Sequence, residues 1–320
     1  MSLPTSQRIK VPQPNHLSLD HYWSALSTYW QHSNRNELIE KWIEDNFELK
    51  IVKILSERLG DQIKDQPLQV LGVGSGEGYQ ERIQMKILKS NFSQISATVL
   101  EPSTEQITKY QDAVAKSCDL GGVNYEWHNQ TFQQYMESTG SAKQKYHFIT
   151  IVEAMYFMGD AEEAVRNLQE LLIPGGVIFM ILATEHTGHG KLQKSFPHLA
   201  LEEQNPRNGE QHPRARARTN YATNSLDVKA VLKKNQIAYT QWSYTASADL
   251  TPCFTQEDTP VAKNLLDIAT NTKDFKESVS DEVFNQVMDF LKHNTRIVKS
   301  DQGEDKYYFD TACDVLLISK

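Results

Sequence analysis

A run of alternating glycines is the part of this 320-residue sequence whose residue types and spacing most clearly indicate chemistry. Gly74, Gly76 and Gly78 follow an apolar stretch at residues 70–73 and precede a helical pattern. Glycines in a strand-to-helix turn let the backbone approach a ligand without Cβ clashes, close to the N-terminus of the next helix. The run therefore predicts a ligand-binding turn.

The glycine spacing also limits which ligands suit the turn. The dinucleotide pattern G-x-G-x-x-G fails in every register, because positions 77, 79 and 81 are Glu, Tyr and Glu, and no P-loop Lys-Ser or Lys-Thr pair follows. The next predicted strand ends in Glu101, whose carboxylate would accept hydrogen bonds from both hydroxyls of a ribose. These features favour a ribose-bearing cofactor without a pyrophosphate. The alternative is a turn used only for tight packing, with Glu101 at a solvated strand end.

Alternating strand and helix patterns surround this turn and must position it. Apolar runs of strand length occur at 68–73, 95–100, 123–127, 147–152 and 177–183. Helical periodicity lies between them at 82–88, 104–116 and 161–172. Strands and helices that alternate in this way predict βαβ units on a parallel sheet. The segment Pro174-Gly175-Gly176 is expected to form the turn between the last helix and the last strand.

The flanking segments follow other patterns. Residues 21–55 predict two helices joined at 32–36, with Arg35 in the joint. Residues 185–220 are rich in Gly, Pro, His, Asn and Arg and predict a long surface connection or lid. Further on we expect a helix, a strand, an amphipathic helix and two closing strands, at 225–234, 238–244, 281–293, 306–309 and 314–319.

Charge and composition narrow the class of partner. Lys and Arg number 33 and Asp and Glu 41, which leaves a formal net charge of −8. Because a negative field repels polyanions, we expect no nucleic-acid and no membrane partner. The 3 cysteines lie far apart without a CxxC pair, which favours a reducing compartment and predicts no metal site. There is no signal-peptide pattern, and no apolar run approaches the ~20 residues that span a bilayer, so we predict a cytoplasmic protein.

A longer series of residues resembles one known family. It runs through Glu101-Pro102-Ser103-Thr104-Glu105-Gln106-Ile107-Thr108-Lys109-Tyr110, Val114-Ala115-Lys116, Trp127-His128, Thr131, residues 147–157 and Cys253-Phe254. In this order the residues resemble histamine N-methyltransferases, which are class I S-adenosylmethionine-dependent methyltransferases. The resemblance extends from Tyr22 to the C-terminus. It implies an α/β fold of the class I methyltransferase, Rossmann-like type: a mixed, mostly parallel sheet flanked by helices, with N-terminal helices and insertions that form an acceptor-binding cap.

The resemblance also implies a domain layout. We expect residues 1–17 to be a disordered or extended N-terminal segment and residues 18–320 to form a single methyltransferase domain. Within it, the N-terminal helical cap would occupy 18–60, the cofactor-binding core 66–184, and lid and cap insertions 185–220 and 245–300. We expect a monomer whose partner is a small-molecule acceptor.

By the same resemblance, a set of residues would bind S-adenosyl-L-methionine and, as product, S-adenosyl-L-homocysteine. The set is Gly74, Ser75, Gly76, Glu101, Gln106, Thr131, Phe132 and Val152. Gly74 would lie beside the methionine part, Glu101 on the ribose with Gln106 next to it, and Thr131 and Phe132 around the adenine. Val152 would offer backbone contacts. The family has a small hydroxyl residue where this chain has Phe132, so the corresponding hydrogen bond to adenine is missing.

The acceptor side departs from the family more strongly. The residues that would line it are Tyr22, Arg35, Glu153, Tyr156, Phe157, His189, Tyr221, Phe254 and Thr311. The family has a Glu that takes the amine of histamine where this chain has Arg35, a cation that would attract a carboxylate by two parallel hydrogen bonds. Glu153 is the candidate catalytic residue, since it would hold one nitrogen of an imidazole or accept a proton from an amine. The alternatives are a solvated charge at Arg35 and a supporting carboxylate at Glu153.

The resulting hypothesis is an N-methyltransferase of a small carboxylate-bearing imidazole or amine, such as histidine or carnosine. Histamine itself is one alternative acceptor. A catalytically silent relative that binds the cofactor is a second alternative. A methyltransferase of nucleic acid or protein is a third, and its nucleic-acid form is disfavoured by the net charge of −8.

Overall fold

The computed structural model describes residues 19–138, 144–184, 186, 188–196, 223–256 and 258–320. The chain divides into two compact units. Unit 1 comprises residues 1–36, 185–221 and 245–312, and unit 2 comprises residues 37–184, 222–244 and 313–320. The predicted insertions 185–220 and 245–300 fall in unit 1, whereas residues 37–60 of the predicted cap fall in unit 2. The predicted N-terminal segment 1–17 and most of the predicted lid lie outside the described residues.

One sheet of eight strands organises the fold. The strands are β1 (Leu68–Val73), β2 (Ile95–Leu100), β3 (Val123–His128), β4 (Tyr146–Val152), β5 (Leu172–Ala183), β6 (Tyr239–Asp249), β7 (Thr295–Lys299) and β8 (Asp305–Ser319). Their order is β3-β2-β1-β4-β5-β8-β6, with β7 paired to β8. Strands β1 to β5 pair in parallel, and β8 pairs antiparallel to β5. The expected mixed, mostly parallel sheet is confirmed.

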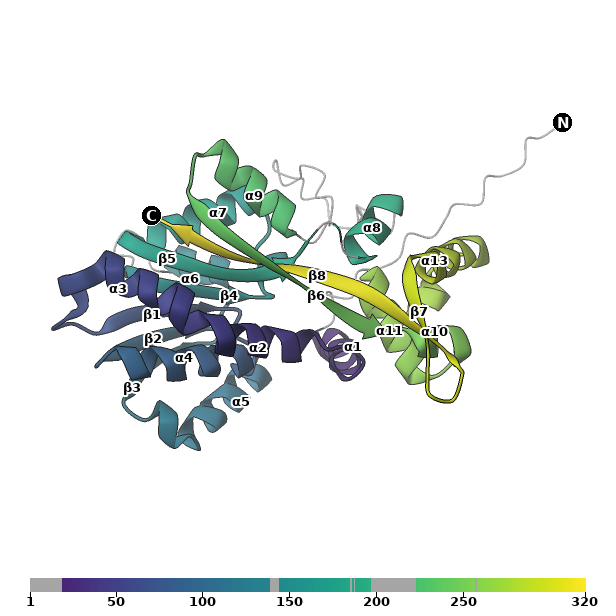
Figure 1. The fold of residues 1–320 in the computed structure, drawn as a ribbon, viewed down its shortest axis with the longest axis horizontal. Helices are drawn as coiled ribbons and strands as arrows, with labels where there is room; N and C mark the ends of the chain where they lie inside the picture. Colours follow the sequence, from purple (N-terminus) through teal and green to yellow (C-terminus); the bar gives the residue numbers. More distant parts are fainter. Residues whose placement is uncertain (1–18, 139–143, 185, 187, 197–222, 257) are drawn as a thin grey trace, which may run out of the picture. The chain divides into compact units, whose positions relative to one another are not determined.

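Helices cover both faces of the parallel strands in unit 2 (Figure 1). The helices are α2 (Arg35–Phe47), α3 (Lys53–Leu59), α4 (Tyr79–Asn91), α5 (Thr104–Ala115), α6 (Phe132–Ser138), α7 (Ala161–Leu171) and α9 (Ser225–Lys234). Short turns are η2 (Glu48–Val52), η3 (Gly60–Ile63), η4 (Cys118–Leu120) and η5 (Met155–Phe157). Val70 packs with α2, α3 and α4, whereas its neighbour Leu71 packs with α6, α7 and α9. Burial on both faces explains why β1, β2, β4 and β5 are mostly apolar, whereas the edge strand β3 is partly exposed and alternates apolar with polar residues.

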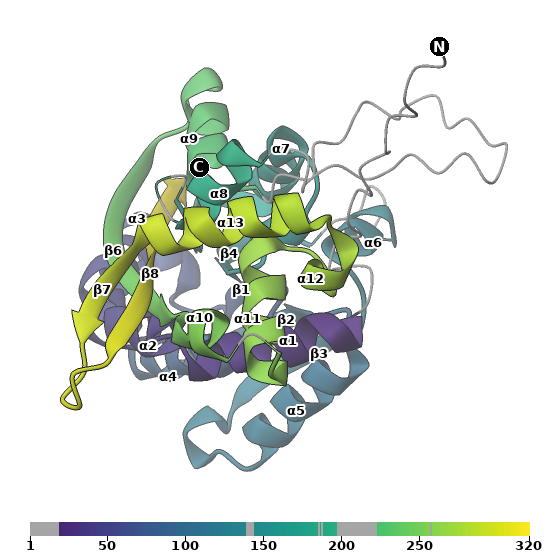
Figure 2. The ribbon, with the colours of Figure 1, turned by 90° about the vertical axis from the view of Figure 1, so that its right-hand side faces the viewer.

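Unit 1 has a core of its own. Its helices are α1 (Leu19–Gln31), α8 (Gly188–Ser195), α10 (Thr251–Thr255), α11 (Pro260–Thr270), α12 (Phe275–Ser278) and α13 (Asp281–Asn294). Figure 2 shows these helices together with the β7–β8 hairpin. Tyr29, Leu192, Leu265, Val287 and Phe309 are all buried in one apolar cluster. Helices α6, α8, α10 and α12 were not predicted, because their segments are short. Helix α11 was also missed, although its buried residues follow a helical spacing.

Three local predictions were wrong. Arg35 is the first residue of α2 and does not lie in the joint, which is shorter than expected. Pro174, Gly175 and Gly176 lie inside β5, where pairing with β4 steps from Tyr146↔Leu172 to Phe148↔Val177. The extra residues on β5 form a bulge, and Gly175 takes φ 86° there. The two closing strands are one strand, β8, that continues through Thr311.

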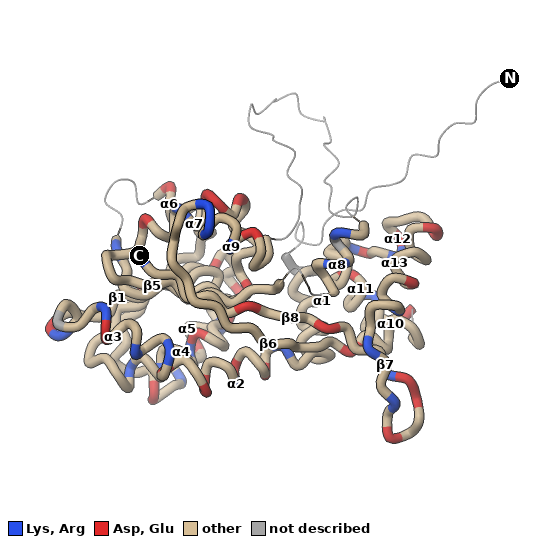
Figure 3. The backbone as a smooth tube through the Cα atoms, turned by 45° about the horizontal axis from the view of Figure 1, so that its top comes forward, with Lys and Arg blue, Asp and Glu red and all other residues tan. Residues whose placement is uncertain are grey.

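Both acidic and basic residues are scattered along the described chain (Figure 3). None of the helices in the described ranges is long and apolar enough to cross a membrane.

A histidine links the two central strands, β1 and β4, near their N-terminal ends. The backbone N–H of Gln69 on β1 donates to Nδ1 of His147 on β4, at 2.8 Å. His147 is 8% exposed, and burial lowers its pKa. A lowered pKa means that the neutral ring is the form that stabilises the fold. This stability is present above the unfolded pKa of about 6.5 and is lost as pH falls below it.

We therefore expect the free energy of unfolding to fall between about pH 8 and about pH 5.5, by on the order of 1 kcal/mol from this site. His147→Asn keeps an acceptor that does not titrate, so its loss over the same range should be smaller. Urea unfolding at both pH values measures this difference. An identical pH dependence in the two proteins would contradict the role given to His147.

Candidate functional site

The ends of three neighbouring strands are joined around one carboxylate. Glu101 follows β2 directly and is 4% exposed. Its Oε2 accepts from the N–H of Gly76 and its Oε1 from the N–H of Ser103, both at 2.8 Å. Its own N–H donates to the carbonyl of His128 at the end of β3, at 3.1 Å. The carboxylate therefore fixes the glycine-rich turn relative to β2 and β3.

Burial raises the pKa of Glu101, and the two backbone N–H groups act in the opposite direction. Each carboxylate oxygen accepts one of these bonds and keeps lone-pair capacity for a further donor. A ligand hydroxyl next to Glu101 would thus meet an acceptor that is already oriented.

At several residues of the glycine-rich turn, the backbone has a conformation that only glycine adopts without strain. Gly74, Gly76 and Gly78 have φ of 64°, 56° and 70°. A Cβ on Gly74 would lie 2.5 Å from the Cβ of Ala154, which follows β4 by two residues. Gly74 N–H also donates to the carbonyl of Leu100 at 2.8 Å. The turn therefore packs closely against the ends of β2 and β4.

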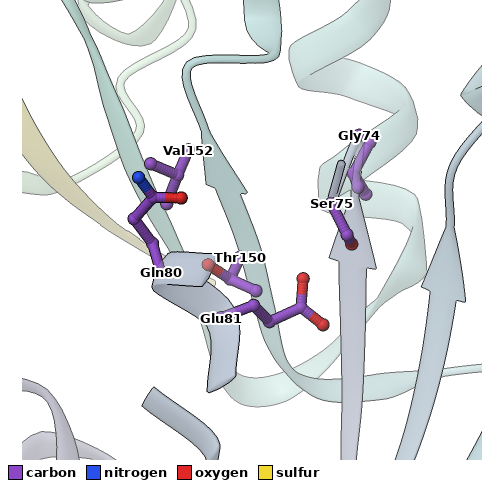
Figure 4. A pocket seen from close by; sticks show the side chains of 7 residues that line it. Gly74, Ser75, Gln80, Glu81, Thr150 and Val152 are labelled. Atoms are coloured by element: carbon purple, nitrogen blue, oxygen red, sulfur yellow. The ribbon is translucent and has the colours of Figure 1, made fainter. Parts of the chain in front are cut away.

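A small cavity opens beside this turn, where the strand order reverses between β1 and β4. It is lined by Val73, Gly74, Ser75, Gln80, Glu81, Thr150 and Val152. In open α/β sheets this switch point at the carboxyl ends of the strands is where ligands bind. Figure 4 shows the carboxylate of Glu81 directed toward the strand that ends at Gly74 and Ser75.

Glu81, Gln80 and Thr150 were not predicted to belong to the site. Glu81 lies in the first turn of α4 and is 6% exposed. Burial raises its pKa to about 7, although the nearby hydroxyls of Ser75 and Tyr110 act to lower it. A sequence signal existed, since Glu81 shares the spacing of Met85 and Leu88 on the buried face of α4. An acid on the apolar face of a helix that follows a glycine-rich turn is a candidate ligand group.

The other predicted cofactor residues lie on elements that surround the turn in unit 2. Gln106 is buried in the first turn of α5, and its N–H donates to Oγ of Ser103. Thr131 immediately precedes α6 and exchanges hydrogen bonds with Gln134. Phe132 begins α6 and packs, partly buried, on the apolar cluster below the sheet. Val152 is the last residue of β4 and lines the cavity.

Glu153 follows β4 in a strained conformation. Its φ is 56°, which is rare for a residue with a side chain. Its N–H donates to the carbonyl of Ile181 at 2.9 Å, and its Oε2 accepts from the Tyr156 hydroxyl at 3.1 Å. That hydroxyl in turn accepts from the N–H of Ala183 at 2.7 Å. The structure thus brings Glu153 and Tyr156 together, while Phe157 is 57% exposed.

Two of the predicted acceptor residues interact in unit 1. Arg35 is 7% exposed, and its positive charge helps burial to lower the pKa of His189 to about 4. His189 is therefore neutral near pH 7 and adds no charge beside Arg35. Its Nδ1–H donates to the carbonyl of Ala269 at 3.2 Å, and its ring packs edge-on against Tyr29 and Phe309.

The remaining acceptor residues are also placed in unit 1. Tyr22 lies on α1, and its ring is edge-on to that of Trp23. Phe254 lies on α10 and packs against Tyr307, with 4.6 Å between the two ring centroids. Thr311 on β8 is fully buried, and its hydroxyl has no hydrogen-bond partner among the described residues. The prediction for Tyr221 falls outside the described residues.

A separate polar cluster in unit 1 has a structural explanation. His21, Asp267 and Asp274 place possible metal-ligand atoms within 4.8 Å of one another. Asp267, however, already accepts hydrogen bonds from His21 Nε2 and from the backbone N–H groups of Asp274 and Phe275. These bonds account for its burial by fixing the segment between α11 and α12.

Comparison with known proteins decides the family. Residues 42–259 match the model of a methyltransferase domain. The chain belongs to the methyltransferase domain family. Together with its fold, this makes it an S-adenosylmethionine-dependent methyltransferase.

Curated relatives of this methyltransferase extend over most of its length. It is 25% identical over 274 residues to carnosine N-methyltransferase 2 of Gallus gallus, covering 84% of this chain and 78% of that one. It is 26% identical over 276 residues to histamine N-methyltransferase of Xenopus tropicalis, covering 85% and 86%. The solved YcgJ protein of Bacillus subtilis is 16% identical, with a TM-score of 0.46, over 82% of this chain and 98% of that one.

The backbone of Glu153 generates a prediction about this methyltransferase. Glu153→Gly and Glu153→Ala both remove the carboxylate, but only glycine relieves the left-handed φ. We expect the glycine variant to be more stable by about 1 kcal/mol. Arg166, exposed in the middle of α7, is the matched control: there glycine should be less stable than alanine by about 1 kcal/mol. Urea unfolding of the four variants measures both differences, and equal stability of the two variants at position 153 would contradict the strain.

Proposed function

We propose that this methyltransferase transfers a methyl group from S-adenosylmethionine to a nitrogen of a small molecule that carries an imidazole or amine and a carboxylate. Histidine and carnosine are the acceptors of this kind that we favour. The observation that carries the proposal is the buried guanidinium of Arg35 near a neutral His189. Arg35 stands where the resembling family has the Glu that takes the amine of histamine. The relative named carnosine N-methyltransferase 2 supports the same class of acceptor, because carnosine carries both groups.

The cofactor half of the proposal rests on unit 2. The residues fit an adenosine with an attached amino acid: Glu101 presents an oriented carboxylate, and the turn at Gly74 leaves no room for a side chain. The buried Oγ1 of Thr150 lines the cavity and has no hydrogen-bond partner among the described residues. We propose that Glu101 holds the ribose with Gln106 beside it, that Gly74, Ser75 and Gly76 contact the amino-acid part, and that Val152 offers backbone groups. Thr131 and Phe132 would flank the adenine.

The cofactor supplies an activated methyl group on a positively charged sulfur. The protein's contribution is to orient the acceptor nitrogen and to exclude water, which is worth roughly 7–11 kcal/mol in well-oriented reactions. An imidazole is mostly neutral at pH 7, so one ring nitrogen has a free lone pair. Glu153 would accept the N–H of the other ring nitrogen, or would take the proton of an amine, with Tyr156 holding the carboxylate.

The other acceptor residues would shape the environment of the nitrogen. Tyr22, Tyr156 and Phe254 would present aromatic surface that disfavours water and favours a developing positive charge. Thr311 would offer a buried hydroxyl to a polar group of the acceptor.

Histamine itself is the second candidate acceptor, because several relatives are named histamine N-methyltransferase. It carries no carboxylate, so it would not use the guanidinium of Arg35. A silent cofactor-binding relative is the third candidate, and it predicts cofactor binding without any methylated product.

The ribose assignment predicts a binding defect. Glu101→Ala removes the acceptor of the ribose hydroxyls and the anchor of Gly76 and Ser103, so the affinity for S-adenosylhomocysteine should fall tenfold or more, or by about 1.4 kcal/mol. Glu105→Ala, an exposed acid on α5, is the control and should leave the affinity unchanged. Titration calorimetry gives both values. Unchanged affinity of Glu101→Ala would remove Glu101 from the ribose site.

The acceptor assignment is tested with a panel of histamine, histidine and carnosine and labelled S-adenosylmethionine, with product mass as the readout. We expect higher kcat/KM for the two carboxylate-bearing acceptors. Arg35→Glu should reverse this preference by roughly tenfold to hundredfold, because a charge-assisted hydrogen bond contributes about 1.5–3 kcal/mol. Arg296→Glu makes the same charge change at an exposed position of unit 1 and should keep the wild-type order. A wild-type preference for histamine would refute the carboxylate idea.

A further inference from the structure

The cavity beside the glycine-rich turn is lined by one acid, Glu81, which is not among the residues proposed above for the cofactor. Glu81 reaches from α4 to a position over Gly72, on the central strand β1. A Cβ at residue 72 would collide with the Glu81 carboxylate, so the glycine leaves the space that the carboxylate occupies. Thr150 pairs with Gly72 across the β1–β4 ladder and is 3% exposed. The carboxylate and the Thr150 hydroxyl therefore lie at the same level of the sheet, one on each side of the switch point.

The surroundings of Glu81 differ from those of a structural buried acid. A buried carboxylate is normally paired with a cation or held by several N–H donors, because burying an unpaired charge is costly. Within the described ranges, no lysine or arginine forms an ion pair with Glu81. Glu81 accepts a hydrogen bond from the Tyr110 hydroxyl at 3.3 Å, and the nearby Ser75 hydroxyl acts to lower its pKa. The acid therefore lies in a site that lacks a positive charge.

The cavity also has the polarity of a cation site. Glu81 is the only charged residue among the seven that line it. The buried Oγ1 of Thr150, without a hydrogen-bond partner in the described chain, offers a second oxygen. A ligand carboxylate would be repelled here, whereas an alkylammonium group would find two acceptors. The turn at Gly74, which borders the cavity, is the part of the site proposed for the amino-acid end of the cofactor.

We propose that Glu81 is a cofactor-binding residue whose carboxylate, with the hydroxyl of Thr150, recognises the α-ammonium group of S-adenosylmethionine and of its product. This inference rests on the proposed function. Glu81 thereby selects a ligand with a charged amino-acid end over one that carries only the adenosine.

If Glu81 binds the ammonium group, the affinity for the cofactor should depend on pH. Burial raises its pKa to about 7, and the nearby charge of Glu101 acts in the same direction. The other titratable groups that face it are Tyr110 from α5 and Tyr125 from β3. The pKa values of both tyrosines are raised, so both remain neutral near pH 7. Because an ammonium group binds the ionised carboxylate, affinity should increase as pH rises through this range.

Titration calorimetry with two ligands tests the proposal. S-adenosylhomocysteine carries the amino-acid end, and 5′-methylthioadenosine has the same adenosine without it. For the wild type, S-adenosylhomocysteine should bind roughly tenfold more weakly at about pH 6 than at about pH 8, while 5′-methylthioadenosine changes little. In Glu81→Gln, S-adenosylhomocysteine should lose tenfold or more in affinity at the higher pH, and its pH dependence should disappear. Binding of 5′-methylthioadenosine should remain.

Two further measurements separate this role from a structural one. Glu77→Gln removes an acid from the same turn, outside the cavity lining, and should bind both ligands like the wild type. Urea unfolding should show Glu81→Gln to be at least as stable as the wild type, because an uncompensated buried acid is removed.

Equal affinity of Glu81→Gln and the wild type for S-adenosylhomocysteine would overturn the inference and leave the proposed function intact. An equal loss for both ligands would also overturn it, since Glu81 would then only shape the turn. A wild type that binds neither ligand would overturn the proposed function and this inference together.

Discussion

The buried carboxylate of Glu101 is the constraint on which the site depends. A charge with 4% exposure needs hydrogen bonds, and the N–H groups of Gly76 and Ser103 provide them. Those bonds hold the glycine-rich turn after β1 against the end of β2, while the backbone of Glu101 is bonded to the end of β3. The positive φ values of the turn follow from this geometry, because the chain must reverse within a few residues while its N–H groups point inward.

A second buried acid, Glu81, adds to the negative charge beside the glycine-rich turn. The like charge of Glu101 helps burial to raise the pKa of Glu81, and neither acid is paired with a lysine or arginine in the described part of unit 2. A site of this kind disfavours anions and suits a ligand that carries positive charge. S-adenosylmethionine has two such groups, a sulfonium and an ammonium. A negative site in a protein with a net charge of −8 is thus consistent with a small cationic ligand.

The candidate cofactor residues all belong to one compact unit, whereas the candidate acceptor residues are divided between the two units. Every described residue proposed for the cofactor belongs to unit 2, together with Glu153, Tyr156 and Phe157. Tyr22, Arg35, His189, Phe254 and Thr311 belong to unit 1. Unit 1 has its own apolar core. Within it, burial keeps His189 neutral, and the charge at Arg35 is not increased by a second cation.

The sequence by itself determined the features that depend on local patterns. These are the five parallel strands, the helices α4, α5 and α7 between them, the glycine-rich turn and the acid after β2, because apolar runs and glycine spacing act over a few residues. Only the tertiary structure decided which distant residues meet. Glu81 reaches the space above Gly72, and Thr150 lies opposite, because α4 packs on β1 and β1 pairs with β4. The interaction of Arg35 with His189 likewise joins segments about 150 residues apart, which no local pattern specifies.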